Sequence, residues 1–147
     1  MDCRHHPDPD AVLPVCVLAD TFGVGLPRRD LLLSPDHALF LNEVLIPVRH
    51  LVDDGAIARV TVNDVTYFHI ELARHDVILA EGLPVESYLD TGDRASFANQ
   101  AVTRLFPAFG APPDANLVRD AYACAPLVIT GPKLDAVRRR LPLQAAA

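Results

Sequence analysis

The sequence lacks the features of several large classes of protein. It has no tryptophan, and aromatic residues make up only 6% of its 147 residues, so its core must rest on aliphatic side chains. Its apolar runs are far shorter than the roughly 20 residues that cross a bilayer, so no membrane-spanning helix is encoded. The three cysteines, Cys3, Cys16 and Cys124, are odd in number and form no C-x-x-C pair. We therefore expect reduced thiols, with neither a disulfide framework nor a zinc knuckle.

Charged residues are few and mainly acidic. They make up 22% of the chain, with 19 acidic against 13 basic residues and a net charge of −6. The basic residues are scattered apart from Arg138, Arg139 and Arg140, so we expect no nucleic-acid partner, because phosphates are bound by clustered positive charge. Residues 1–10 are polar and acidic, whereas a secretory signal has a basic end followed by an apolar run. We therefore expect no membrane partner and, by default, a cytoplasmic location.

The hydrophobic residues favour a β protein. Half of all residues are hydrophobic, which is enough for one core in a chain of this length. Thirteen prolines are spread along the sequence and leave little room for a long helix before about residue 94. Short runs rich in Val, Leu and Ile and bounded by Pro, Gly, Asp or Asn are typical of strands. The predicted strands are 12–18, 30–33, 38–41, 44–46, 57–62, 65–72 and 77–80.

Turn and helix signals organise these pieces. Asn42 and Glu43 separate two apolar runs by two residues, which predicts a tight hairpin. Within 65–72 apolar and polar side chains alternate, which predicts a strand with one face in water. Residues 93–106 have helical spacing, and 133–141 predict a short basic helix that Pro142 ends. We therefore expect a flexible terminus at 1–10, a β domain at 11–92 and a partly helical extension at 93–147.

Two segments carry candidate chemical groups. The first has Ser34 and His37 three residues apart, followed by an apolar strand, the turn at 42–43 and a returning strand. Taken alone, Ser-Pro-Asp at 34–36 is a good β-turn that His37 only stabilises. The second has His75 and Asp76 after the alternating run 65–72, followed by the apolar run 77–80 and a Glu-Gly turn at 81–82. A histidine near a carbonyl can act as a general acid or base.

Together, the two segments resemble motifs of the Hedgehog/intein (Hint) domains. Ser34 and His37 match the T-x-x-H motif of that family, with Ser34 in the threonine position. His75 and Asp76 match the His-Asn of the closing intein motif, where an apolar strand and an Asn-Gly turn follow. The run 25–92 looks like the bacterial Hint-type domains that do not end as inteins do. The resemblance covers about 11–92 and implies a mainly β, Hint-type fold.

The resemblance implies self-processing of a peptide bond. Hint domains rearrange the bond before their own first Cys or Ser, in an N-to-S or N-to-O acyl shift that leads to autocleavage. By resemblance, His37 would donate a proton to the departing amide nitrogen, and Ser34 would hold the scissile peptide by hydrogen bonding. His75 and Asp76 would assist resolution of the intermediate. The substrate would be the protein's own polypeptide.

The sequence departs from the family pattern in two places. The Cys-containing start motif is absent, and Cys3 is followed by two histidines and a Pro/Asp-rich stretch unlike that motif. Glu86 and Ser87 stand where an intein ending would cyclise its asparagine, and the chain continues. We therefore expect a truncated domain, the second half of a Hint module, that is inactive alone. Its partner would be a complementary N-terminal Hint half that bears the cysteine.

Other interpretations stay open. A non-catalytic β-domain remnant or protein-binding module would use the same residues only to stabilise turns. Metal-binding His-Asp pairs lie on helices with further ligands, and Cys3, His5 and His6 lack a fourth zinc ligand nearby, so we expect neither metal nor cofactor. A hydrolase of separate substrates is least favoured, because no serine lies in a G-x-S-x-G elbow.

Overall fold

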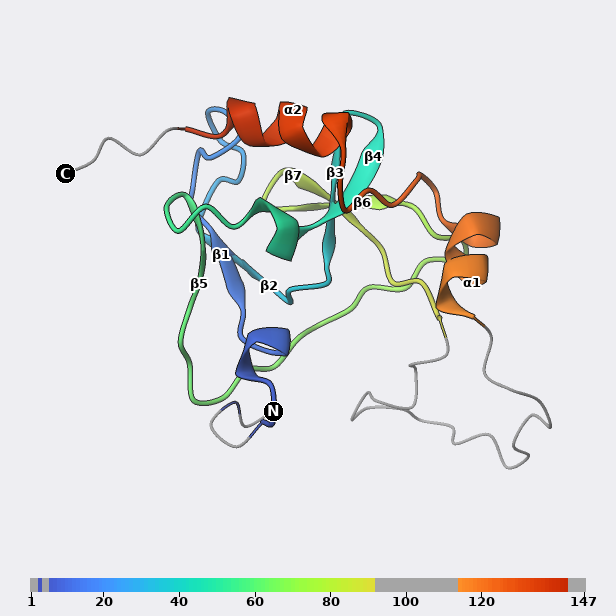
Figure 1. Ribbon diagram of the computed structural model, residues 1–147, viewed down its shortest axis with the longest axis horizontal. Helices are drawn as coiled ribbons and strands as arrows, with labels where there is room; N and C mark the ends of the chain where they lie inside the picture. The colour runs from blue at the N-terminus through green and yellow to red at the C-terminus, as the bar shows by residue number, and fades with distance from the viewer. Residues whose placement is uncertain (1–2, 4–5, 92–113, 143–147) are drawn as a thin grey trace.

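The structure, a computed structural model, describes Cys3 and the ranges 6–91 and 114–142. In this part of the chain the strands form two antiparallel sheets, which confirms the mainly β prediction (Figure 1). The three-stranded sheet has the order β2 (Leu31–Leu33), β1 (Val15–Val17), β5 (Ile57–Arg59). The four-stranded sheet has the order β4 (Val44–Pro47), β3 (Ala38–Leu41), β7 (Leu83–Glu86), β6 (Val77–Ala80).

Two tight hairpins build the four-stranded sheet. Asn42 (φ 51°) and Glu43 (φ 63°) join β3 to β4, and Glu81 (φ 50°) and Gly82 (φ 87°) join β6 to β7. Left-handed φ at both central residues matches the right-handed twist of the paired strands, so two residues are enough for each reversal. The hairpin predicted at 42–43 and the turn at 81–82 are both confirmed. The second turn leads directly into β7, a strand that the sequence pattern did not predict.

One predicted strand is wrong. Residues 65–72 run through the structure without joining either sheet. Among their contacts are the Tyr67 hydroxyl donating to the Val12 carbonyl and the Tyr88 amide donating to the Ile70 carbonyl. These are single bonds, whereas a strand needs the repeated backbone pairs of a ladder. Alternating polarity alone therefore did not make this segment a strand. The strands predicted at 12–18 and 57–62 exist but are shorter, at Val15–Val17 and Ile57–Arg59.

A single core joins both sheets and the last helix. Helix α2 (Pro132–Arg140) follows Gly131, whose φ of 101° suits glycine, and has proline in its first turn and three arginines in its last. It lies across one end of the strands in Figure 1 and confirms the basic helix predicted at 133–141. The core residues are Val15, Val17, Leu33, Leu39, Val44, Ile46, Val48, Leu51, Ile57, Leu83, Val85, Leu134, Val137 and Leu141. Residues from the predicted extension therefore pack with those of the predicted β domain.

The other described helix is attached differently. Helix α1 (Ala115–Tyr122) begins at Asp114, whose side chain accepts a hydrogen bond from the Asn116 amide at 2.8 Å. It buries no side chain, and in Figure 1 it stands at the edge of the molecule. The helix predicted at 93–106 lies outside the described residues. Among the described residues, no helix has the length and apolar composition needed to span a membrane.

The role of α2 in the core leads to a prediction about stability. Leu134 is 1% exposed, so Leu134→Ala is expected to leave a cavity and lower the free energy of unfolding by about 2–3 kcal/mol. Leu117 on α1 is 67% exposed, so Leu117→Ala is the matched control and is expected to change stability by no more than about 0.5 kcal/mol. Urea denaturation followed by circular dichroism measures both. Equal effects would mean that α2 is not part of the core.

Candidate active site

A buried carboxylate stands at the centre of the candidate site. Glu86 is the last residue of β7, and its side chain is 9% exposed. One carboxylate oxygen, Oε1, accepts a hydrogen bond from the Ala38 amide at 3.0 Å. The other, Oε2, lies 3.2 Å from His75 Nε2 and 3.2 Å from Arg119 Nη1. Glu86 therefore ties together the start of β3, the segment before β6 and helix α1.

Strand register explains why these groups meet. In the β6–β7 hairpin Val77 pairs with Glu86, so His75, two residues before β6 begins, lies beside the end of β7. In the β3–β7 pair Leu39 faces Val85, which brings the residues before β3 to the same end of the sheet. His37 is one of these residues. Both histidines therefore reach Glu86 from opposite neighbours of the same strand.

His37 is fixed by its backbone and its ring. Its amide donates to the Ser34 carbonyl at 3.0 Å, which closes the Ser-Pro-Asp-His turn, and its carbonyl accepts from the Val48 amide at 2.9 Å. Its ring Nε2 lies 3.1 Å from the Glu86 carbonyl oxygen, so this nitrogen carries the proton and donates. The ring also stacks on that of His69, with centroids 5.9 Å apart.

Burial controls the charge of His37. Desolvation lowers the pKa of His37 below its ordinary value, and nearby Glu86 opposes this shift only in part. The imidazole is therefore neutral near pH 7, with its proton on Nε2 and a lone pair on Nδ1. A neutral ring of this kind can accept a proton and then return it, which is what a general base followed by a general acid must do.

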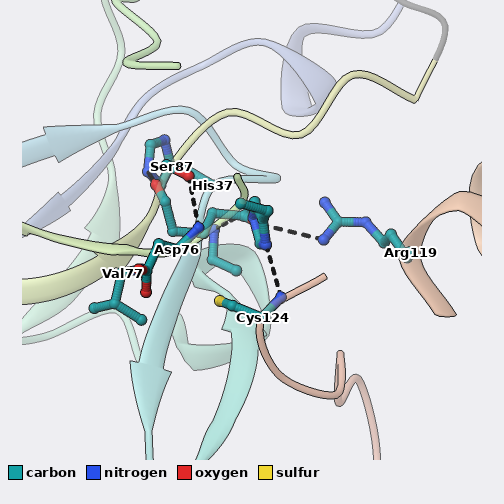
Figure 2. Close-up of polar contacts among 9 residues, drawn as sticks. His37, Asp76, Val77, Ser87, Arg119 and Cys124 are labelled. Atoms are coloured by element: carbon teal, nitrogen blue, oxygen red, sulfur yellow. Dashed lines mark hydrogen bonds and ion pairs between the residues drawn. The ribbon is translucent and has the colours of Figure 1, made fainter. Parts of the chain in front are cut away.

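Two contacts hold the ring of His75. Its side chain is 1% exposed, and its Nδ1 accepts a hydrogen bond from the backbone amide of Cys124 at 2.9 Å (Figure 2). A nitrogen that accepts from an N–H group carries no proton, so the remaining ring proton lies on Nε2 and points to Glu86.

The other two predicted site residues contribute through different atoms. Ser34 contributes its backbone carbonyl to the turn that places His37. Asp76 extends the β6–β7 ladder: its amide donates to the Ser87 hydroxyl at 2.9 Å, and its carbonyl accepts from the Ser87 amide at 2.8 Å (Figure 2). The carboxylate of Asp76 accepts from the Val77 amide at 2.7 Å. The structure thus joins His37 and His75 through Glu86, while Asp76 lies next to the cluster in the chain.

The three free cysteines lie in different surroundings. Cys3 is 3% exposed and donates its amide to the Asn63 carbonyl at 2.8 Å, and it neighbours Tyr67, whose pKa rises to about 12 through burial and this thiol. Burial, with Asp30, raises the pKa of the Cys16 thiol. Burial, with Asp76 and then Glu86, also raises the pKa of the Cys124 thiol. A raised pKa lowers the thiolate fraction and with it the reactivity of these two thiols.

The described residues also offer no ready site for a metal. Within Cys3, 6–91 and 114–142, no three side chains of the His, Cys, Asp and Glu types are grouped so that they could hold an ion. His75 uses one ring nitrogen on Glu86 and the other on a backbone amide. Neither nitrogen is therefore available as a ligand in this arrangement.

Sequence reasoning missed the groups that connect the site. Glu86 was noted only as a departure from the intein ending, and Arg119 was not singled out. A signal for Glu86 was present: a two-residue turn at 81–82 fixes the register of the hairpin, which puts Glu86 beside Val77 and so near His75. No comparable signal existed for Arg119, which reaches the site at a separation of 33 residues.

The fold and site define a two-sheet β protein in which His37 is held on the backbone carbonyl of Glu86 and His75 on its buried carboxylate. Comparison with protein-family models agrees with this architecture: the Hint domain model matches residues 1–92, which is more than half of the chain. The chain therefore belongs to the Hint domain family. Searches of curated proteins and of solved structures give no significant match.

Proposed function

We propose that this Hint domain supplies the proton-transfer groups of a self-processing reaction, an N-to-S or N-to-O acyl shift that leads to autocleavage. The single observation that carries the proposal is His37, a partly buried, neutral histidine whose Nε2 is held on the Glu86 carbonyl. This is the state required of a group that first takes a proton and later returns it near pH 7. We further propose that the nucleophilic cysteine or hydroxyl comes from another segment, so that the chain alone does not cleave.

In the proposed reaction His37 takes up one proton and later returns it. A thiol of the incoming segment gives its proton to His37 Nδ1, and its sulfur bonds to the carbonyl carbon of the scissile peptide. Negative charge collects on the carbonyl oxygen, where backbone or hydroxyl donors stabilise it. The C–N bond then breaks, the nitrogen takes the proton back from His37, and a thioester remains. A proton transfer of this kind contributes about 10²–10⁴-fold in rate.

The neighbouring residues have positioning roles in this proposal. Glu86 fixes the ring of His37 through its carbonyl and the ring of His75 through its carboxylate. Ser34, at the start of the turn that holds His37, would hold the scissile peptide, and His75 with Asp76 would assist resolution of the ester or thioester. Hydrogen bonds of this kind keep reacting groups within the short distances that proton transfer requires.

The proposed partner is a complementary N-terminal Hint half with its own cysteine. Both sheets have edge strands at which such a partner can add: β2 and β5 in the three-stranded sheet, and β6 in the other. Extended segments bind sheet edges through main-chain hydrogen bonds, which is the common mode of strand addition. Leu32 on the β2 edge strand is 52% exposed, so part of this edge also offers apolar surface.

A mass measurement tests the proposed function. The chain alone, incubated with a small thiol, is expected to keep one unchanged mass, because it lacks the attacking group. After mixing with an N-terminal Hint half that carries the cysteine and a reporter cargo, the cargo is expected to be released in a thiol-dependent manner. Intact-mass spectrometry measures both. Thiol-dependent loss of a fragment from the chain alone would overturn the need for a partner, and no release from the mixture would overturn the proposed chemistry.

A second candidate function is a non-catalytic β module. Within the described residues no buried side-chain nitrogen or oxygen lacks a hydrogen-bond partner, so the Glu86 cluster is also well made as a purely structural element. In that case His37 and His75 serve only to hold the strand ends together. Absence of any cleavage from the mixture, together with loss of stability when Glu86 is removed, would favour this alternative.

A further inference from the structure

The segment that contacts the candidate site buries little apolar surface, although Val128 packs against the core. We define the strap as residues 115–130, which comprise α1 and the extended stretch after it. No residue of the strap is buried, whereas α2 immediately after it buries Leu134 and Val137 in the core. Leu117 and Tyr122 of the strap are 67% and 70% exposed. Segments with few buried apolar contacts open locally at low free-energy cost.

The strap nevertheless contacts both Glu86 and His75 in the candidate site. Arg119 Nη1 lies 3.2 Å from Glu86 Oε2, and the Cys124 amide donates to His75 Nδ1 at 2.9 Å. Figure 2 shows Arg119 and Cys124 reaching the cluster from separate parts of the strap. With both contacts in place the side chain of His75 is 1% exposed and that of Glu86 is 9% exposed. A substrate peptide could reach these atoms only after the strap has left.

The strap also pairs with a sheet edge. Strand β4 lies at one edge of the four-stranded sheet. The Leu45 amide donates to the Pro126 carbonyl, and the Val128 amide donates to the Leu45 carbonyl, both at 2.8 Å. Leu45 and Leu127 form a parallel bridge, so the strap adds itself to the sheet as an extended peptide would.

We propose that the strap is a removable occupant of a peptide-binding surface formed by the β4 edge, His75 and Glu86. The ligand class is a peptide whose extended part pairs with Leu45 and which places a cationic side chain on Glu86. Because α2 stays anchored in the core, the strap can open without unfolding the sheets. This inference rests on the proposed function, since it regulates access to the same site, but it concerns accessibility and not cleavage.

The first test removes one backbone hydrogen bond of the strap. Cys124→Pro deletes the amide that donates to His75, and Ala123 already has the extended conformation (φ −67°, ψ 141°) that a residue before proline needs. Cys124→Ala keeps the amide and is the matched control. Reaction of His75 with diethyl pyrocarbonate, located by peptide mass and compared with exposed His69, is expected to be about five- to tenfold faster in Cys124→Pro and unchanged in Cys124→Ala.

A second variant and a second measurement keep the test decisive if the proline variant fails to fold. Arg119→Ala removes the ion pair to Glu86 and is expected to speed the reaction of His75 about three- to tenfold. Hydrogen exchange should show faster exchange in the strap, while amides of β3 and α2 stay protected. Unchanged reactivity of His75 in the folded variants, or equal loss of protection in β3 and α2, would overturn the strap as a separate opening unit.

Binding of a probe peptide tests the surface itself. A synthetic peptide with the sequence 115–130 is the probe. It is expected to bind at least about fivefold more tightly to whichever of Cys124→Pro and Arg119→Ala is better folded than to the unchanged chain, because the competing strap is less often in place. A scrambled peptide of equal composition is the control. Equal affinities would overturn the peptide-binding surface. If these effects are seen but the mixture never cleaves, the proposed self-processing function is wrong, while the proposal for the strap stands.

Discussion

Replacing His37 with alanine is expected to slow thiol-dependent cleavage in the mixture with a cysteine-bearing half by about 10²–10⁴-fold. The variant lacks the nitrogen that takes the proton of the thiol and returns it to the departing amide. His37 donates to a backbone carbonyl and stacks on His69. His37→Gln keeps a side-chain donor near the Glu86 carbonyl but cannot shuttle a proton, so we expect it to be as slow as His37→Ala.

His50 supplies the matched control for this experiment. It lies in the short 3-10 helix Val48–Leu51, and its carbonyl accepts two hydrogen bonds from Arg138 at 2.9 and 2.7 Å. Because these bonds use the backbone, His50→Ala keeps them and is expected to cleave at close to the unchanged rate. Timed intact-mass measurements give both rates. Cleavage by His37→Ala at the rate of the unchanged chain would remove His37 from the mechanism.

Replacing Glu86 with alanine is expected to lower the free energy of unfolding by about 3–5 kcal/mol, because one member of a buried, hydrogen-bonded charge cluster is removed. The variant leaves the Ala38 amide, His75 Nε2–H and Arg119 without their shared acceptor. Each of the buried donors then loses its partner without regaining water. A loss of this size is a large part of the total stability of a small domain.

Glu81 is the matched control for Glu86. It is a glutamate in the same β6–β7 hairpin and also pairs with an arginine, at 2.6 Å from Arg29 Nη2. The side chain of Arg29 is 79% exposed and that of Glu81 is 29% exposed, so Glu81→Ala is expected to lower the stability far less than Glu86→Ala does. Urea denaturation of both variants compares the two costs. Similar values for the two glutamates would contradict the central role of Glu86.

Local signals predicted much of the four-stranded sheet. Two polar residues between apolar runs predicted the β3–β4 hairpin, and Asn42 and Glu43 do adopt left-handed φ there. Strand β6 has the predicted bounds, and α2 begins one residue before the predicted helix and ends one residue before its predicted end. These elements depend on interactions between residues close in sequence, so they can be predicted without knowledge of the fold.

Signals that depend on a distant partner failed. The alternation in 65–72 predicted a strand, but strand formation requires a neighbour with free backbone groups, and the segment joined neither sheet. Strand β7 was missed because Leu-Pro-Val-Glu contains proline and a charge, both of which count against a central strand. It is nevertheless the strand between β3 and β6, where pairing on both sides overrides local preference.

The candidate site was likewise predicted only in part from the sequence. His37 and His75 were found from motifs whose spacing resembles that of Hint domains, and the family comparison agrees with that resemblance. Glu86 and Arg119 carry no motif, because their importance comes from meeting His75 in space. The conclusion that His75 Nδ1 accepts a hydrogen bond likewise needed the position of the Cys124 amide, 49 residues away in the chain.

The sequence by itself determined the family, the mainly β class, the two tight turns and the two histidines, because composition, turn residues and short motifs act over a few neighbouring positions. Only the tertiary structure decided that Glu86 holds both histidines, His37 through its carbonyl and His75 through its carboxylate, that α2 completes the core and that the strap contacts the site. The physical reason is that hydrogen bonding and burial depend on which strand ends lie side by side. Pairing of β7 with both β3 and β6 sets that arrangement, and residues far apart in the chain create it together.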